Sequence, residues 1–196
     1  MTLILASQSA SRQAMLAAAG VAFEAVPAHV DETAIKAAMV GASPRDLADK
    51  LAELKAVKVS ARHPGALVLG SDSLVALADG RILDKPTDRA DAAAHLRAMA
   101  GGTHQLWSAA VLARDAAPLW RHVEAAKLSV RPLADAFIAA YLDAEWPAIA
   151  GCVGCFRIEG PGVQLFDRVE GSHFTILGMP LLPVLGQLRV LGALPS

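Results

Sequence analysis

The chain opens with a short apolar run followed by helical periodicity. Leu3–Ala6 is interpreted as a buried strand, because a short continuous apolar run bounded by polar residues is typical of a strand covered on both faces. Gln13–Ala19 is predicted to be a helix that ends at Gly20, a residue type favoured at helix C-caps. A second helix is predicted to begin at Ser43–Asp46, where serine, proline and aspartate suit the first turn. Its apolar face is marked by Leu47, Leu51 and Leu54.

The middle of the chain is dominated by apolar segments separated by tight turns. Ala66–Ala78 is predicted to be a strand interrupted by the polar residues 70–73, and Asp79-Gly80 predicts a hairpin that returns through Arg81–Leu83. The other predicted elements are strands at Val21–Val26, Gln105–Arg114, Leu119–Val130 and Val163–Val169, helices at Asp88–Met99, Leu133–Glu145 and Leu181–Leu191, and a loop at Glu170–Pro180. This order favours an α/β fold with a mixed sheet, in a single domain over residues 1–196.

Composition narrows the class of protein. The 196 residues are 54% hydrophobic and carry a formal net charge of -1, which argues against a nucleic acid polymer as partner. No apolar stretch is long enough for a membrane span, and the apolar run near the N-terminus is too short for a signal peptide. Cys152 and Cys155 are too few for a disulfide scaffold and lack the further ligands of a zinc site. We therefore expect a cytoplasmic protein.

Hydroxyl and guanidinium groups cluster between the first strand and the first helix, in residues 7–12. A helix N-terminus presents unpaired backbone N–H groups and a partial positive charge. Ser7, Ser9 and Arg12 at such an end are therefore candidates for binding phosphate. Ordinary N-capping by a serine, with Arg12 in solvent, is an equally good interpretation of this local sequence.

Asp72 lies within an apolar segment, with leucine or valine on both sides within three residues. Burying a carboxylate costs free energy unless it is paired or binds a cation. A divalent metal at Asp72 would offset this cost and give the aspartate a catalytic role. The alternative is a strand end at which Asp72 caps a turn, and we favour the functional interpretation.

Four further charged residues are candidates for the same site. Lys85 follows the returning strand of the hairpin, at a separation from Asp72 that suits neighbouring antiparallel strands, and is expected to neutralise phosphate charge. Lys55 lies in an alternating charged helix, where a solvated face is the better local interpretation. Glu32 and the preceding Asp31 either coordinate magnesium or manganese, or cap the next short helix.

Taken in order along the chain, these segments resemble the Maf family of nucleotide pyrophosphatases. The resemblance covers nearly the whole chain. Each motif is weak alone, whereas seven in the right order are specific. The matching stretches are Leu5–Arg12, Asp31–Thr33, Lys55–Ala56, Gly70–Asp72, Lys85–Pro86, Gly101–His104, and Glu170–Ser172 followed by Gly178–Leu181.

The resemblance implies a twisted mixed sheet flanked by helices with a central nucleotide cleft, a homodimer, and a divalent cation such as Mg, Mn or Co. It also implies hydrolysis of a nucleoside triphosphate to monophosphate and pyrophosphate, with Asp72 as the base that activates water against the α-phosphate. Lys85 is expected to assist catalysis, and Glu32 and Asp72 to hold the metal. The remaining matches, Ser7, Ser9, Arg12 and Lys55, fall on substrate-binding stretches.

Three positions bear on the base of the nucleotide. The family branch that acts on dTTP and UTP typically carries arginine, threonine and glutamine there, and the branch that acts on 7-methyl-GTP carries tryptophan, glutamine and glutamate. This chain has Ser11, Ser73 and Glu159, of which only Glu159 matches, and it slightly favours 7-methyl-GTP. A carboxylate accepts hydrogen bonds from the N–H edge of guanine.

Departures from the family pattern motivate an alternative function. Ala10 and Ser11 replace the usual Pro-Arg pair, and Cys152 replaces a frequent lysine, so positive charge is lost. A catalytically weak nucleotide-binding regulator of cell division is therefore a second hypothesis. A phosphomonoesterase that uses the same metal site is a third, and it would release orthophosphate.

Overall fold

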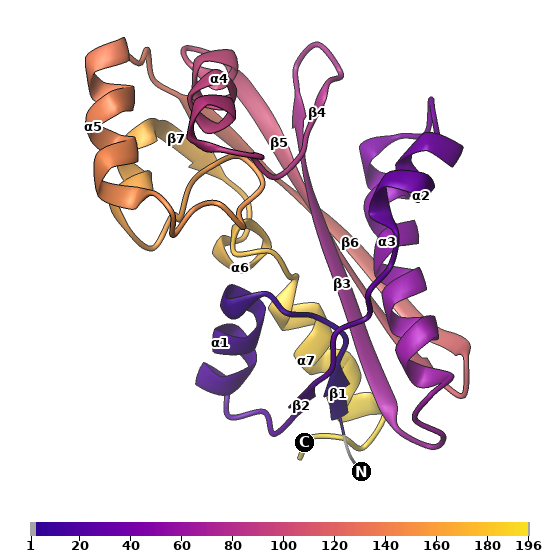
Figure 1. Cartoon of the computed structure of the whole chain (residues 1–196). Helices are drawn as coiled ribbons and strands as arrows, with labels where there is room; N and C mark the ends of the chain where they lie inside the picture. Colours follow the sequence, from indigo (N-terminus) through magenta and orange to yellow (C-terminus); the bar gives the residue numbers. More distant parts are fainter. Residues whose placement is uncertain (1–2, 196) are drawn as a thin grey trace. The chain divides into compact units, whose positions relative to one another are not determined.

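The computed structural model describes residues 3–195 and contains a mixed sheet flanked by helices (Figure 1). The strands are β1 (Leu3–Leu5), β2 (Glu24–Ala25), β3 (Leu67–Leu77), β4 (Ile82–Leu83), β5 (Thr103–Arg114), β6 (Ala117–Val130) and β7 (Phe166–Glu170). The helices are α1 (Ala10–Ala18), α2 (Glu32–Ala38), α3 (Pro44–Ser60), α4 (Arg89–Met99), α5 (Asp135–Glu145), α6 (His173–Ile176) and α7 (Leu181–Val190), with a 3-10 helix η1 at Pro161–Leu165.

The sheet has the strand order β2-β1-β3-β5-β6-β7, and β4 pairs with β3 outside this path. The pairs β1–β2 and β1–β3 are parallel, whereas β3–β4 and β6–β7 are antiparallel. The predicted fold class, an α/β fold with a mixed sheet and flanking helices, is therefore confirmed. Within residues 3–195 we find no helix of the length and apolar character that a membrane crossing requires.

The chain forms two compact units, each assembled from separate segments. Unit 1 comprises residues 3–73, 107–124 and 173–195, and unit 2 comprises residues 74–106 and 125–172. The strands β3, β5 and β6 contribute residues to both units. One domain over residues 1–196 stays a prediction.

Side-chain caps begin four of the helices. Ser9, Asp31, Ser43 and Asp88 each accept a hydrogen bond from the backbone N–H three residues later, which satisfies a donor that the first helical turn leaves free. The predicted start of a helix at Ser43 is therefore confirmed. α1 starts earlier than the sequence pattern indicated, because Ser9 caps it.

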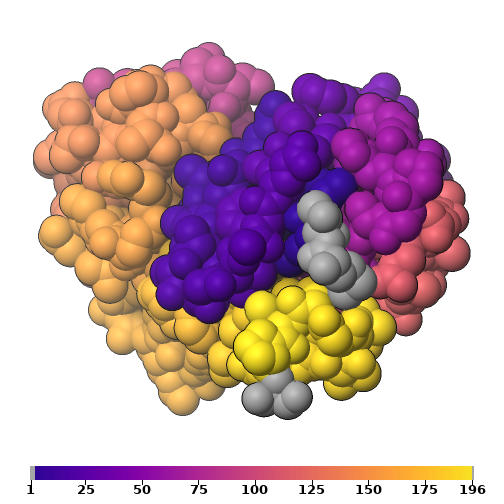
Figure 2. All heavy atoms as spheres, turned by 90° about the horizontal axis from the view of Figure 1, so that it is seen from below, coloured from indigo at the N-terminus to yellow at the C-terminus, as the bar shows by residue number. Residues whose placement is uncertain are grey.

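Alternating side chains of β1 and β3 build two cores on opposite faces of the sheet in unit 1. Leu5 and Leu69 pack with residues of α1 and α7, whereas Ile4 and Val68 pack with Val59 of α3. Figure 1 shows α1 and α7 on one side of these strands and α3 on the other. Figure 2 shows the C-terminal segment of unit 1 beside its N-terminal residues. Since side chains of a strand alternate, odd-numbered positions of β3 face α1 and α7 and even-numbered positions face α3.

Gly70 allows β3 to lie directly against α3. A Cβ atom at this position would lie 2.2 Å from the carbonyl oxygen of Ala52 and 2.6 Å from the backbone nitrogen of Ala56. Both distances are far below van der Waals contact, so only glycine permits this approach. The close packing brings Lys55, on the same helix, within reach of Asp72, two residues beyond Gly70.

We expect Gly70→Ala to lower the free energy of unfolding by roughly 1–3 kcal/mol, the usual cost of an overpacked core. Urea unfolding followed by circular dichroism measures the change. Gly186→Ala is the matched control, because a Cβ atom at that position in α7 meets no atom within 4 Å. Equal stability of Gly70→Ala and the wild type would show that β3 and α3 are not packed this closely.

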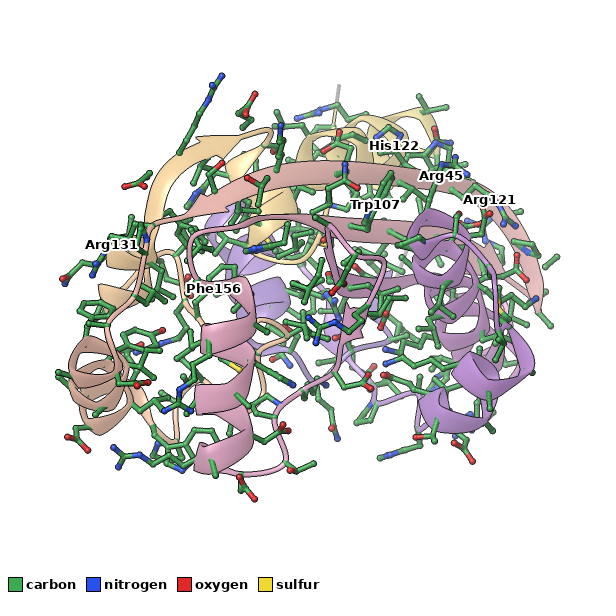
Figure 3. All side chains as sticks on the ribbon, turned by 90° about the horizontal axis from the view of Figure 1, so that it is seen from above. Arg45, Trp107, Arg121, His122, Arg131 and Phe156 are labelled. Atoms are coloured by element: carbon green, nitrogen blue, oxygen red, sulfur yellow. The ribbon has the colours of Figure 1, made fainter. Side chains whose placement is uncertain are left out.

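Unit 2 contains α4, α5, η1 and β7. Arg97 in α4 pairs with Asp135 in α5 at 2.7 Å. The ring of His104 lies beside the rings of Phe156 and Phe166, with centroid distances of 6.3 and 6.1 Å. Burial lowers the pKa of His104 to about 4, so its imidazole is neutral near pH 7. Phe156 is labelled in Figure 3.

Several predicted elements differ from the structure. The predicted strand Val21–Val26 is reduced to β2 at Glu24–Ala25. The interruption predicted at residues 70–73 is wrong, because β3 is continuous and its polar side chains have partners within unit 1. The first half of the predicted strand Val163–Val169 lies in η1, whose 3-10 turn begins at Pro161. The predicted loop Glu170–Pro180 contains the short helix α6.

Candidate active site

The acidic centre of unit 1 lies in the middle of β3. Asp72 is only 5% exposed, and its Oδ1 accepts a 2.5 Å hydrogen bond from Nζ of Lys55. The same Nζ lies 2.6 Å from Oε1 of Glu32, the first residue of α2. One ammonium group thus balances two carboxylates, which offsets the cost of burying Asp72. The alternative interpretations, a turn cap for Asp72 and a solvated Lys55, are wrong.

The two acidic residues at the start of α2, Asp31 and Glu32, have different roles. Asp31 is the N-cap of α2, and its Oδ1 accepts a 2.9 Å hydrogen bond from the backbone nitrogen of Ala34. Glu32 instead contacts Lys55. The capping alternative therefore holds for Asp31, while Glu32 belongs to the charged cluster around Asp72.

Arg12 is buried at the N-terminal end of α1, with 9% of its surface exposed. Its Nε donates to the carbonyl of Gly178 at 2.8 Å, and its Nη2 donates to Oγ of Ser73 at 3.0 Å. A longer contact of 3.3 Å joins Nη1 to Oγ of Ser7. Ser9 caps the helix by accepting from the backbone nitrogen of Arg12. Capping by a serine is thus confirmed, whereas a solvated Arg12 is wrong.

The guanidinium of Arg12 interacts electrostatically with the carboxylates of Asp72 and Glu32. Burial lowers the pKa of Arg12, and the carboxylates of Asp72 and Glu32 oppose this shift by favouring the charged guanidinium. A charged guanidinium beside a helix N-terminus is well suited to bind phosphate oxygens. Together with Lys55 it supplies two cationic groups beside two carboxylates.

Gly178 is a site residue that local sequence patterns did not reveal. Its carbonyl accepts from Nε of Arg12 and lies 3.1 Å from Oγ of Ser71 and 3.0 Å from Oγ of Ser73. Its φ of 105° is in the region that favours glycine. The signal was present only as a family motif, Gly178–Leu181, and nothing in it connected this glycine with Arg12.

The remaining predicted residues are distributed over both units. Ser11 is half-buried within α1, whereas Lys85 and Glu159 are exposed residues of unit 2. Within unit 2 the charges of both residues affect the pKa of the Cys152 thiol. The main cause of its raised pKa is burial, Glu159 raises it further, and Lys85 lowers it. Cys152 and Cys155 are both free thiols, and burial raises the pKa of Cys155 to about 12.

The donor set of unit 1 fits a cation that binds together with substrate. Across residues 3–195, no group of three or more histidine, cysteine, aspartate or glutamate side chains is arranged to hold a metal ion. Asp72 and Glu32 are, however, two carboxylates that share one positive group. Mg²⁺ is usually bound through one or two carboxylates, several waters and the phosphates of a substrate. The two carboxylates meet that requirement, and a preformed cage is not needed.

Comparison with known proteins identifies a family model and relatives that match nearly the whole chain. A profile of the family described as Maf-like protein matches residues 2–191. A nucleoside triphosphate pyrophosphatase of Sphingopyxis alaskensis is 58% identical over 198 residues, which cover 100% of both chains. A protein of the same name from Caulobacter vibrioides is 53% identical over 97% of this chain and 96% of its own. A 7-methyl-GTP pyrophosphatase of Rhizobium etli is 51% identical over 98% of this chain and 97% of its own.

Proposed function

The chain belongs to the Maf-like protein family, and from this membership we propose that it hydrolyses nucleoside triphosphates to nucleoside monophosphates and pyrophosphate. The observation that carries the proposal is the charged cluster of Asp72, Lys55 and Glu32 in unit 1, in which Asp72 is buried and the side chain of Glu32 is 35% exposed. Burying the carboxylate of Asp72 within an apolar strand costs folding free energy even when Lys55 pairs with it. A catalytic role explains why such a carboxylate is present.

Arg12, Ser7 and Ser9 are proposed to bind the phosphates. The Nε of Arg12 is fixed by the carbonyl of Gly178, so the guanidinium has a defined orientation. The long contact between its Nη1 and Ser7 is the one that a phosphate oxygen would replace, because a charged acceptor binds more strongly than a hydroxyl. Lys55 then shares its charge between the carboxylates and the phosphates.

Asp72 is proposed to orient a water molecule and accept its proton as the water attacks the α-phosphorus. Lys55 holds the carboxylate in one orientation through the 2.5 Å bond, which removes the need to order it during the reaction. Arg12 and Lys55 stabilise the charge that develops on the leaving pyrophosphate. Lys85 is assigned the same role from the family resemblance.

Glu32 and Asp72 are the residues that would hold a divalent cation such as Mg, Mn or Co. When bound, such a cation neutralises phosphate charge and polarises the phosphoryl oxygens.

A nucleotide panel tests the proposed function. The protein is incubated with Mg²⁺ or Mn²⁺ and dTTP, UTP, CTP, GTP or 7-methyl-GTP, and pyrophosphate and orthophosphate are measured separately. Release of pyrophosphate supports the proposal. Orthophosphate as the first product would favour a phosphomonoesterase. Bound nucleotide without either product would favour the regulator of cell division that the changes at Ala10, Ser11 and Cys152 motivate.

Glu159 is proposed to favour 7-methyl-GTP, as in the family branch that it matches. We expect Glu159→Gln to lower the ratio of kcat/KM for 7-methyl-GTP to kcat/KM for UTP by at least about tenfold, since an amide mispairs with the guanine N–H edge. Asp167→Asn, another exposed carboxylate of unit 2, is the control. An unchanged ratio in Glu159→Gln would remove Glu159 from base recognition.

A homodimer and a cytoplasmic location remain proposals that rest on the family resemblance and on composition. Light scattering of the purified protein, with and without nucleotide, measures the first.

A further inference from the structure

Hydrogen bonds link Arg12 to the backbone of α6 through two serines. Nη2 of Arg12 lies 3.0 Å from Oγ of Ser73, which lies 2.8 Å from Oγ of Ser108. Oγ of Ser108 in turn lies 2.8 Å from the carbonyl oxygen of Thr175. All four residues belong to unit 1, and Ser108 and Thr175 are fully buried.

The direction of these bonds follows from counting hydrogens. Each serine hydroxyl has one hydrogen, and the carbonyl of Thr175 can only accept. If Ser108 donates to Thr175, then Ser73 donates to Ser108 and its lone pairs accept from Arg12. In this arrangement each of the two hydroxyls donates once and accepts once. The reverse direction would leave Ser108 with nothing to accept, which is unfavourable for a buried hydroxyl.

Thr175, the last residue in this series of hydrogen bonds, makes two further hydrogen bonds. Oγ1 of Thr175 donates to Oε2 of Glu124 at 2.6 Å, and the backbone nitrogen of Gly178 donates to the carbonyl of Thr175 at 3.1 Å. Glu124 lies 3.1 Å from Nε2 of His122, whose place on β6 Figure 3 shows. The segment that anchors Ser108 therefore also supplies the Gly178 carbonyl that binds Nε of Arg12.

We infer that Ser108 is a positioning residue for Arg12 and thereby sets the affinity of the site for the phosphates of its substrate. The inference rests on the proposed function. With Ser108 in place, Ser73 donates away from Gly178 and leaves that carbonyl to Arg12 and Ser71. Without it, the Ser73 hydrogen turns to the Gly178 carbonyl, 3.0 Å away, and competes with Nε of Arg12. The guanidinium then loses its single orientation.

The test compares Ser108→Ala with Ser60→Ala. Ser60 is also a fully buried serine of unit 1, but it bonds the backbone of Val57 and Ala116. Binding of inorganic tripolyphosphate is measured by calorimetry, and KM and kcat are measured with the best nucleotide. In Ser108→Ala we expect Kd for tripolyphosphate to rise by roughly three- to tenfold and kcat/KM to fall by at least the same factor, because Arg12 binds the phosphates in the ground state and in the transition state. Ser60→Ala leaves Kd and kcat/KM at the wild-type values.

Two further variants keep the test decisive if Ser108→Ala folds poorly. Ser108→Thr retains the hydroxyl and is expected to restore most of the tripolyphosphate affinity. Ser73→Ala breaks the same series of hydrogen bonds one bond earlier and should by itself weaken tripolyphosphate binding. Where Ser108→Ala folds, its double variant with Ser73→Ala should bind no more weakly than Ser73→Ala alone. Additive losses would mean that the two serines act separately and would overturn the inference.

The outcomes separate the inference from the proposed function. Wild-type affinity for tripolyphosphate in a folded Ser108→Ala would overturn the inference, as would equal losses in Ser60→Ala. Weaker tripolyphosphate binding in Ser108→Ala alone, in a protein that releases no pyrophosphate from any nucleotide, would support the inference about Arg12 while the proposed function fails.

Discussion

Asp72→Asn is expected to lower the rate of pyrophosphate release by about 10²- to 10⁴-fold while unit 1 stays folded. Asparagine keeps the shape of the side chain and an oxygen that can accept from Lys55, but it cannot take a proton from water. Loss of a general base usually costs about 10²- to 10⁴-fold in rate, and we expect kcat to fall within that range. A continuous assay for pyrophosphate, with the nucleotide that the wild type prefers, measures the fall.

The matched control for this prediction is Asp46→Asn. Asp46 is an exposed aspartate in the first turn of α3, in the same unit as Asp72. Its replacement should leave kcat within about twofold of the wild type, as is usual for a surface position away from the site. Wild-type turnover in a correctly folded Asp72→Asn would remove Asp72 from the role of base.

Lys55→Met is expected to lower both stability and activity. The change leaves the carboxylates of Asp72 and Glu32 without the ammonium that they share. Because the side chain of Lys55 is only 12% exposed, water replaces this ammonium poorly. Breaking a buried ion pair by removing one partner costs about 3 kcal/mol or more, and the phosphates lose a cation as well. Urea unfolding and kcat/KM measure the two effects, and we expect kcat/KM to fall by at least about 100-fold.

A double variant separates charge balance from catalysis. In Lys55→Met combined with Asp72→Asn, the buried charge is removed together with its partner, so most of the lost stability should return while kcat/KM stays as low as in the single variants. Lys50→Met is the control, because Lys50 lies on the same helix with its side chain 44% exposed. A stability of Lys55→Met equal to that of Lys50→Met would contradict the pairing of Lys55 with Asp72.

The sequence predicted the acidic centre better than its partners. Asp72 was recognisable because burying a carboxylate inside an apolar run costs free energy unless a partner or a cation compensates for it. Lys55 was recognisable only through the family resemblance, because within α3 it follows the pattern of a solvated face, and the residues that it binds lie on β3 and α2. The polar residues 70–73 were predicted to interrupt the strand because their partners are distant in the sequence. In the structure, alternation along β3 places Asp72 toward α3, and Ser71 and Ser73 toward Gly178.

The fold was predictable where local signals are strong. The cap at Ser43 and the apolar run at the start of the chain marked α3 and β1 correctly, since both depend on neighbouring residues. The short helix α6 was missed because it has only four residues, too few for a periodicity to appear. The roles of Lys85 and Glu159 stay predictions, as do the metal and the central nucleotide cleft.

The position of water attack tests the central claim most directly. The protein is allowed to turn over its preferred nucleotide in ¹⁸O-labelled water, and both products are analysed by mass spectrometry. If Asp72 directs water to the α-phosphorus, a single ¹⁸O atom appears in the nucleoside monophosphate and none in pyrophosphate. Label in the pyrophosphate, or in orthophosphate, would place the attack on another phosphorus and contradict the account.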